Sequence, residues 1–220
     1  MLNQIDDFDG CFPFFTHFEG HDGMIGFMQI DDRTDALIGS EFEFLAKKRG
    51  QAAKAFVSGR RCVRALQKQL NISEFELPSG EFGPIWPSDL VGSISHSREL
   101  AAATILRDAV SVGIDIECQR RLKVDAIRRV ATKEEYSRYS VVPDFDWTLL
   151  FSAKESVFKA FSPLARCYIG FQEVELLLDT KAQSFSVRYF GNNIDKGLFE
   201  RSEGHWSALA GHLITIVTVN

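Results

Sequence analysis

The residues best suited to chemistry are two acids in the segment GIDIE, residues 113–117. Successive side chains of a strand point to opposite faces, so Asp115 and Glu117 would share one face while Ile114 and Ile116 share the other. Two neighbouring carboxylates repel each other unless they share a cation, and hard oxygen ligands suit Mg²⁺. A half-exposed strand with a polar outer face would show the same alternation, so this pattern alone leaves both interpretations open.

A third acid lies in FSAKESVFKAF, residues 151–161, where the apolar spacing predicts a helix over 147–161. Glu155 and Lys159 are four residues apart and share a helix face, with Ser152 one turn earlier. Such a pair is common on exposed helices. Combined with the acidic strand, however, Glu155 would complete a Mg²⁺ site open to phosphate, and Lys154 and Lys159 would neutralise that phosphate.

The segment SISHS, residues 93–97, adds hydroxyl and imidazole groups. A serine hydrolase using Ser95 or Ser97, His96 and Asp115 is one interpretation. Adjacent strand residues face opposite ways, and the chain has no G-x-S-x-G motif, so that interpretation is weak. Donation of hydrogen bonds to a phosphate fits Ser95 and His96 better. P-loop and Rossmann motifs are also absent.

The charges are unevenly distributed along the chain. The 220 residues carry a net charge of −5, but residues 1–45 carry −9 and residues 46–75 carry +7. This basic segment has helical apolar spacing from Ala52 to Leu70, and Asn71 would end the helix. Either a solvated helix face or a site for an anion explains its charge.

Overall composition narrows the class of protein. An apolar fraction of 45% and a charged fraction of 25% are typical of a globular protein. The net negative charge argues against a protein that coats nucleic acid, and no stretch has the ~18 apolar residues of a membrane span. No secretory signal begins the chain, and the four widely spaced cysteines indicate a reducing compartment, which we take to be the cytoplasm.

The remaining pattern predicts helices and strands in both halves. Prolines and glycines make 78–90 a loop, and 91–97, 100–106 and 109–117 read as strands, the last two joined as a hairpin through Arg107 and Asp108. Residues 124–139 read as a helix with an internal Thr132-x-x-Glu135 capping signal. Ser162-Pro163 would end the helix of 147–161. Further strands are expected at 174–179, 184–190 and 212–219.

The motifs WPSDLVGSISHS, SVGIDIE and FSAKESVFKAFSP occur in this order, preceded by RGQAAKAFVSGRRCVRAL. Together they resemble the 4′-phosphopantetheinyl transferases, most closely the enterobactin synthase component D kind that serves siderophore synthases. The resemblance covers about residues 45–165. It implies an α+β fold of two similar halves, here 1–108 and 109–220, related by a pseudo-twofold axis with the active site in the cleft between them.

The resemblance also implies a reaction and its residues. The phosphopantetheine group of coenzyme A would pass to a serine of a carrier protein, in a Mg²⁺-dependent reaction that releases 3′,5′-ADP. Asp115, Glu117 and Glu155 would bind the metal, with Glu155 or a water on the metal as base. Lys159 would contact the pyrophosphate. The phosphates of coenzyme A would be held by the following residues: Arg49, Arg60, Ser95, His96 and Lys154, with Lys47, Lys48 and Arg61 as alternatives in the basic segment.

One departure from the family and several alternatives remain. The family usually has a basic residue just before the Pro-x-Trp-Pro segment, where this chain has Glu81-Phe82-Gly83, so a contact to coenzyme A would be missing. We expect a monomer that modifies carrier domains of a nonribosomal peptide synthetase, in a siderophore pathway. Carriers of polyketide, fatty-acid or lipopeptide assembly are the alternative substrates, and a non-catalytic protein that binds carrier proteins is the alternative function.

Overall fold

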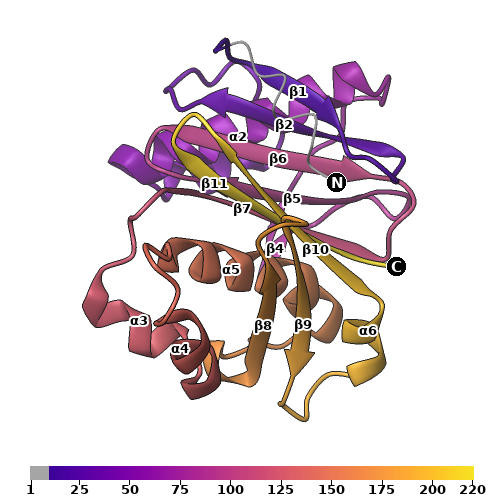
Figure 1. The fold of residues 1–220 in the computed structure, drawn as a ribbon. Coiled ribbons are helices and arrows are strands. Elements are labelled where there is room, and N and C mark those ends of the chain that lie inside the picture. Colours follow the sequence, from indigo (N-terminus) through magenta and orange to yellow (C-terminus); the bar gives the residue numbers. More distant parts are fainter. Residues whose placement is uncertain (1–9) are drawn as a thin grey trace.

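The computed structural model describes residues 10–220, which form two antiparallel sheets, each packed against one long helix (Figure 1). The first sheet has the order β1-β2-β6-β5 and the second β7-β11-β10-β9-β8. The strands of the first sheet are β1 (Phe14–His17), β2 (Gly23–Gln29), β5 (Val91–His96) and β6 (Leu100–Leu106). Those of the second are β7 (Ser111–Cys118), β8 (Val174–Asp179), β9 (Ser184–Tyr189), β10 (Ser202–Leu209) and β11 (His212–Val219). The predicted α+β class is confirmed.

The helices are α1 (Glu41–Ala46), α2 (Gly50–Gln69), α3 (Val124–Val130), α4 (Lys133–Tyr139), α5 (Trp147–Ala165) and α6 (Lys196–Glu200). Two short strands, β3 (Ser79–Gly80) and β4 (Gly83–Pro84), form a separate hairpin. Among the described residues, no helix is long and apolar enough to cross a membrane. The sequence pattern did not predict β1, β2, β10, α1 or α6, and the segment 78–90, which it predicted as a loop, contains the hairpin β3–β4.

Helix α2 packs against the first sheet as its apolar spacing predicted, although Ala52 is exposed. The helix ends where expected, because Asn71 adopts a left-handed conformation with φ of 52°. Gly59 allows close packing, since a Cβ atom there would lie 2.8 Å from the Ile94 side chain on β5. This contact ties the basic helix to the strand that carries SISHS.

The predicted hairpin between residues 100–106 and 109–117 is wrong. Strand β6 lies between β2 and β5 in the first sheet, whereas β7 pairs with β11 in the second. Both strands are almost fully buried. The short segment after Leu106 carries the chain from the first sheet to the second, where β7 is the terminal strand.

The two sheets meet along β5 and β7, where serine side chains replace a backbone ladder. The Ile114 amide donates to Ser93 Oγ at 3.1 Å, and the Ile116 amide donates to Ser95 Oγ at 3.4 Å. Both sheets also contribute residues to one shared apolar core, among them Phe27 of β2 and Ile214 of β11. The predicted boundary at 108/109 falls between these sheets, and the pseudo-twofold relation of two separate halves stays a prediction.

Two helix ends differ from the sequence prediction. Helix α5 continues through Ser162-Pro163 to Ala165, because a proline in the last turn removes only one amide donor from a helix that is about to end. The segment 124–139 forms two helices rather than one. The break lies at the predicted capping signal, where Thr132 and Glu135 cap the start of α4 reciprocally.

Candidate active site

Asp115 lies at the centre of a buried polar cluster between β7 and α5. Its Oδ1 accepts hydrogen bonds from Ser95 Oγ at 2.8 Å and Lys159 Nζ at 2.7 Å, and its Oδ2 accepts one from Ser152 Oγ at 2.8 Å. The helix can approach because position 113 is glycine: a Cβ atom there would lie 1.9 Å from the Ser156 carbonyl oxygen. Close packing of α5 on β7 therefore places the helix side chains over the acidic strand.

Glu117 shares a face with Asp115, as the alternation predicted, but has different partners. Its Oε1 pairs with the guanidinium of Arg121, four residues later. Its Oε2 is buried and has no hydrogen-bond partner among the described residues. Burial raises the pKa of the Glu117 carboxyl, and the charge of Asp115 raises it further, while Arg121 lowers it. An unpaired buried carboxylate oxygen is a position that a cation or a proton would stabilise.

Glu155 completes a group of three carboxylates. It is half-buried, and no hydrogen bond to its carboxylate is found among the described residues. Burial raises the pKa of Glu155, and the charges of Asp115 and Glu117 raise it as well, while Lys159 lowers it. The structure thus brings the three predicted acids close enough to influence one another.

The carboxylates fit Mg²⁺ by chemistry, although they are not arranged as a finished ligand set. Among residues 10–220, no group of three or more His, Cys, Asp or Glu side chains could hold a metal ion as it stands. Glu117 is turned toward Arg121 and Asp115 toward Lys159, so the two cations balance the acidic charge. The hard oxygen donors and the unpaired Oε2 of Glu117 match the preference of Mg²⁺ once Arg121 moves away.

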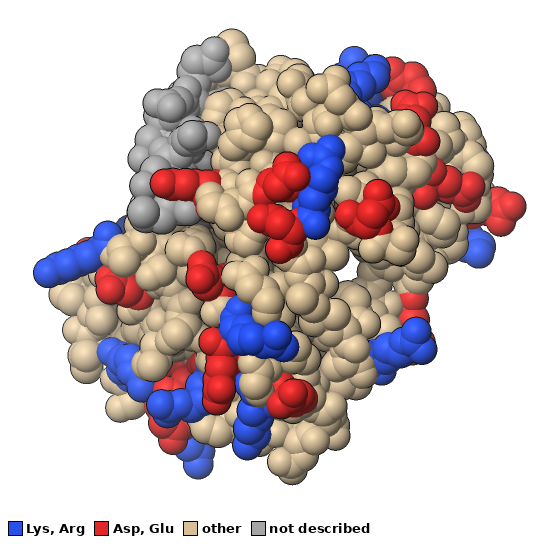
Figure 2. Space-filling view, turned by 90° about the vertical axis from the view of Figure 1, so that its right-hand side faces the viewer, with Lys and Arg blue, Asp and Glu red and all other residues tan. Residues whose placement is uncertain are grey.

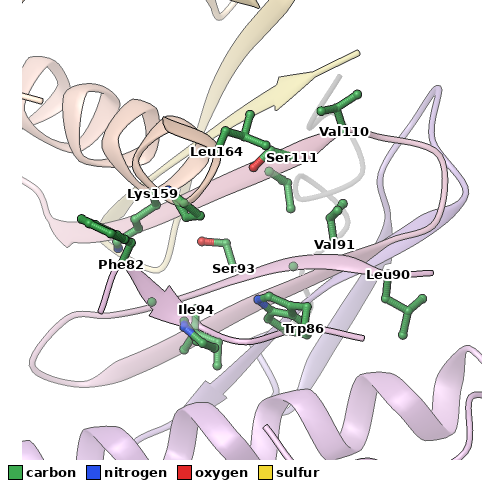
Figure 3. Close-up of a pocket in the computed structure, with 15 residues that line it drawn as sticks. Phe82, Trp86, Leu90, Val91, Ser93, Ile94, Val110, Ser111, Lys159 and Leu164 are labelled. Atoms are coloured by element: carbon green, nitrogen blue, oxygen red, sulfur yellow. The ribbon is translucent and has the colours of Figure 1, made fainter. Parts of the chain in front are cut away.

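Lys159 connects the acidic cluster to a cavity. Its ammonium contacts Ser95 Oγ, Asp115 Oδ1 and the Ile114 carbonyl oxygen at 2.7, 2.7 and 3.1 Å. The side chain also lines a cavity of about 450 Å³ between the two sheets, whose opposite wall includes Trp86 and Leu90 (Figure 3). Lys159 therefore places a positive charge where an apolar cavity meets the carboxylates.

The structure contradicts the prediction that Lys154 binds a phosphate of coenzyme A. Its side chain is fully buried and forms an ion pair with Glu135 at 2.7 Å. The ammonium also donates to the carbonyl oxygens of Val130, Phe171 and Val174, at 2.9, 2.7 and 2.7 Å. Because Lys154 has neither exposed surface nor a free donor, it cannot bind coenzyme A without unfolding this region.

Ser95 and His96 lie on opposite sides of β5. Ser95 Oγ contacts Asp115 and Lys159, whereas His96 Nδ1 contacts the Ser97 carbonyl oxygen at 3.3 Å. Ser97 Oγ bonds to the Leu100 backbone, so neither serine hydroxyl bonds to the His96 ring, and the serine hydrolase arrangement is absent from the described residues. Burial lowers the pKa of the His96 ring. The ring lines two further cavities, of about 320 and 660 Å³.

The basic segment is only partly a solvated helix face, because Lys54 and Lys68 are exposed but two of its arginines are not. Arg60 and Arg64 are buried, and Arg64 forms an ion pair with the fully buried Glu41 at 2.5 Å. Arg60 lies over the Phe56 ring, donates to Ser79 Oγ at 3.2 Å and lines the 320 Å³ cavity together with Lys48. Burial lowers the pKa of Arg60 to about 10.

The other basic residues predicted to contact coenzyme A do not line this cavity. Arg49 donates to the carbonyl oxygens of Ala46 and Lys48, and Arg61 pairs with Asp31. Lys47 lies over the Phe44 ring. Of the five basic candidates, Lys48 and Arg60 are the two that line the cavity. On the face shown in Figure 2, acidic and basic side chains are interspersed.

Several residues of this site were not assigned by sequence reasoning. Ser152 orients Asp115, and Ser93 joins β7 to β5. Arg121 forms an ion pair with Glu117. Gln51, Arg98 and Arg121 line the 660 Å³ cavity. The spacing of Ser93 and Ser95 on one strand face was the available signal for the serines, and the Glu117–Arg121 spacing was that for the arginine.

Comparison with known proteins agrees with this geometry. Residues 43–106 match a family model described as the 4′-phosphopantetheinyl transferase N-terminal domain, and residues 111–217 match that of the 4′-phosphopantetheinyl transferase superfamily. The chain is 33% identical to 4′-phosphopantetheinyl transferase Svp of Streptomyces mobaraensis, over 86% of this chain and 81% of that protein.

Two further relatives match very different shares of this chain. 4′-Phosphopantetheinyl transferase PptT of Mycobacterium tuberculosis is 28% identical over 81% of this chain and 84% of its own length. Enterobactin synthase component D of Salmonella austin is 43% identical, but over 36% of this chain and 35% of that protein. The family models and the extensive match to a transferase show that this chain is an enzyme of the 4′-phosphopantetheinyl transferase superfamily.

Proposed function

We propose that this enzyme transfers the 4′-phosphopantetheine group from coenzyme A to a serine hydroxyl of a carrier protein, with Mg²⁺ bound by its acidic cluster. The observation that carries the proposal is the junction of three cavities around β5, with cationic groups on one side and carboxylates on the other. The 450 and 320 Å³ cavities share Ile94, and the 320 and 660 Å³ cavities share His96.

The 320 Å³ cavity suits the nucleotide end of coenzyme A. Lys48 and Arg60 provide positive charge there, and the Phe56 ring provides an aromatic surface. Phosphate groups favour such cationic donors, and Arg60 retains its proton at neutral pH because its pKa, although lowered, is about 10. His96 stands where this cavity meets the next.

The 450 Å³ cavity suits the pantetheine arm, which is an uncharged chain of amides and methylenes. Its lining is mainly apolar, including Trp86, Leu90 and Leu164, with Lys159 at one end (Figure 3). The ammonium of Lys159 contacts Asp115 Oδ1 there. An arm in this cavity would leave its phosphate near Lys159, because the ammonium is the cationic group of the lining.

Asp115, Glu117 and Glu155 would hold the metal ion. A bound Mg²⁺ would offset the charge of the pyrophosphate and of the leaving oxygen. The unpaired Oε2 of Glu117 and the carboxylate of Glu155 are the free donors that support this proposal. Arg121 would have to release Glu117, and its exposed side chain, with 58% of its surface accessible, can do so without disturbing the fold.

The transfer step breaks one phosphorus–oxygen bond and forms another. The serine oxygen of the carrier attacks the phosphorus that carries the pantetheine arm, and the bond to the bridging oxygen breaks, so that 3′,5′-ADP leaves. Lys159 stabilises negative charge on the phosphate. Glu155 would accept the serine proton, and a water on the metal is the alternative base, because direct binding of Mg²⁺ would weaken the basicity of the carboxylate.

The pathway is the finer part of the proposal. The 43% identity to enterobactin synthase component D supports a carrier domain of a siderophore-producing peptide synthetase. The more extensive similarities are to two other transferases, so carriers of polyketide, fatty-acid or lipopeptide assembly remain the alternative substrates. A monomer in the cytoplasm is the setting we propose for this reaction.

A mass measurement tests the function directly. The purified chain, an apo carrier domain, coenzyme A and Mg²⁺ are incubated, and the carrier should gain about 340 Da, the mass of one phosphopantetheine. Asp115→Asn and Glu155→Gln keep the side-chain shapes and should each abolish the gain, as should removal of the metal with a chelator. If the unaltered chain binds coenzyme A but the carrier gains no mass, the result would instead support a non-catalytic binding protein. Full activity of both variants would refute the metal assignment.

A panel of carriers tests the pathway. Faster modification of siderophore-synthetase carriers than of polyketide or fatty-acid carriers would support the siderophore proposal. The opposite preference would refute it and leave the transferase activity unaffected.

A further inference from the structure

The hairpin β3–β4 forms a wall shared by two of the cavities described above. Gly83 and Pro84 line both the 450 Å³ and the 320 Å³ cavity. Phe82, at the tip of the hairpin, lines the first, and Ser79, at its base, lines the second. A ligand that occupies both cavities must therefore pass beneath this hairpin or be enclosed by it.

Among the described residues, no backbone ladder anchors the hairpin to the rest of the chain, although Arg60 donates to Ser79 Oγ at its base. The hairpin belongs to neither of the two large sheets, and each of its strands is two residues long. The Ile85 amide donates to the Pro78 carbonyl oxygen at 2.9 Å and closes the hairpin at its base. An isolated two-stranded hairpin is only marginally stable, so its position depends on contacts that it makes with other segments.

The tip of the hairpin contacts the other half of the molecule through an aromatic pair. The rings of Phe82 and Tyr168 are 5.2 Å apart at an interplanar angle of 58°. The Tyr168 hydroxyl also donates to the Glu81 carbonyl oxygen at 3.4 Å, a long and weak hydrogen bond. Tyr168 follows helix α5, so this pair spans the cleft between the two sheets.

We propose that Tyr168, acting through Phe82, is a latch that holds the hairpin β3–β4 closed over the ligand cavities, so that coenzyme A enters and leaves when the aromatic contact opens. The identity of the ligand rests on the proposed function, whereas the latch itself rests on the contacts across the cleft. Tyr168 is a positioning residue, because it does not line the cavities that its partner encloses.

Tyr168 is also a suitable residue to change. Its surface is 73% exposed, so truncation leaves no buried void and should not unfold the chain. Tyr168→Ala removes the ring, and Tyr168→Phe retains the ring and removes only the weak hydroxyl contact. Phe190→Ala is a matched control, because Phe190 is a 51% exposed aromatic residue for which no ring contact is found in the described structure.

Hydrogen exchange tests the latch without any ligand. The Ile85 amide, bonded within the hairpin, reports on its opening. An aromatic pair of this kind contributes enough to change the open population about two- to tenfold. Tyr168→Ala should therefore accelerate exchange at Ile85 by that factor, while Tyr168→Phe and Phe190→Ala exchange like the unaltered chain. Equal exchange in Tyr168→Ala and the unaltered chain would refute the latch.

Release of coenzyme A tests whether the latch controls the ligand. In stopped-flow displacement, Tyr168→Ala should release coenzyme A about two- to tenfold faster, again with Tyr168→Phe unchanged. Faster exchange with unchanged release would refute control of the ligand by the hairpin. If the unaltered chain binds no coenzyme A, the proposed function fails, and the exchange experiment still decides whether the latch exists.

Discussion

Replacement of Lys154 by methionine should destabilise the enzyme strongly while leaving the proposed coenzyme A site intact. Lys154 is fully buried, and its ammonium contacts Glu135 and three carbonyl oxygens. Burial lowers the pKa of Lys154, and the charge of Glu135 opposes this effect. Methionine fills a similar volume but leaves the Glu135 carboxylate buried without its counter-ion.

The magnitude follows from the burial of both partners. Removal of one partner from a buried ion pair costs about 3–5 kcal/mol. For a chain of this size, each kcal/mol lowers the melting temperature by roughly 2–4 °C, so Lys154→Met should melt about 6–20 °C lower. Glu135 also caps α4 and accepts from the Leu176 amide at 2.7 Å, so loss of Lys154 should weaken the attachment of α4 to β8.

Thermal unfolding and calorimetric titration with coenzyme A measure the two effects separately. The double variant Lys154→Met/Glu135→Gln serves as control, and it should lose less stability than Lys154→Met because no charge remains buried alone. Below its melting temperature, Lys154→Met should bind coenzyme A with unchanged affinity. A normal melting temperature together with weakened binding would refute the structural role and restore Lys154 as a ligand contact.

Three further predictions concern the acidic cluster. Arg121→Ala frees Glu117 and should tighten Mg²⁺ binding by the free protein about two- to fivefold, by calorimetry; unchanged or weaker binding would count against competition between cation and arginine. Ser152→Ala removes a hydrogen bond to Asp115 and should slow transfer about 10–100-fold with little change in coenzyme A affinity, so an unaltered rate would deny its positioning role. Because burial raises the pKa of Glu155 above its ordinary 4.5, the stability linked to its proton is present at low pH and lost as the pH rises through the raised pKa. Glu155→Gln should therefore unfold at higher urea concentration than the unaltered metal-free chain at pH 7, with the gap closing on acidification, and the reverse order would contradict the pKa shift.

Much of the site could be predicted because its residues are placed by local geometry. Strand alternation put Asp115 and Glu117 on one face, and helical spacing put Glu155 and Lys159 on another, and the structure confirms both arrangements. The capping signal of Thr132 and Glu135 was correct for the same reason, since its two hydrogen bonds join residues three apart. The motif order was sufficient to indicate the family.

Contacts between distant segments decided what local patterns left open. Lys154 and Lys159 are similar residues on one helix, but packing turns Lys154 toward the buried Glu135 and Lys159 toward the cavity. The sequence left a solvated face and an anion site open for the basic helix, and the structure shows that one of its cations, Arg64, pairs with the buried Glu41.

The sequence by itself determined the family, the order of the motifs and the α+β class. Only the tertiary structure decided that β6 and β7 belong to different sheets, that serines of β5 join the two sheets, and that the tip of the β3–β4 hairpin contacts Tyr168. The physical reason is the distance along the chain over which each interaction acts. Strand alternation and helix capping depend on residues two to four apart, whereas sheet pairing, burial and the contact between Glu81 and Tyr168 join distant segments.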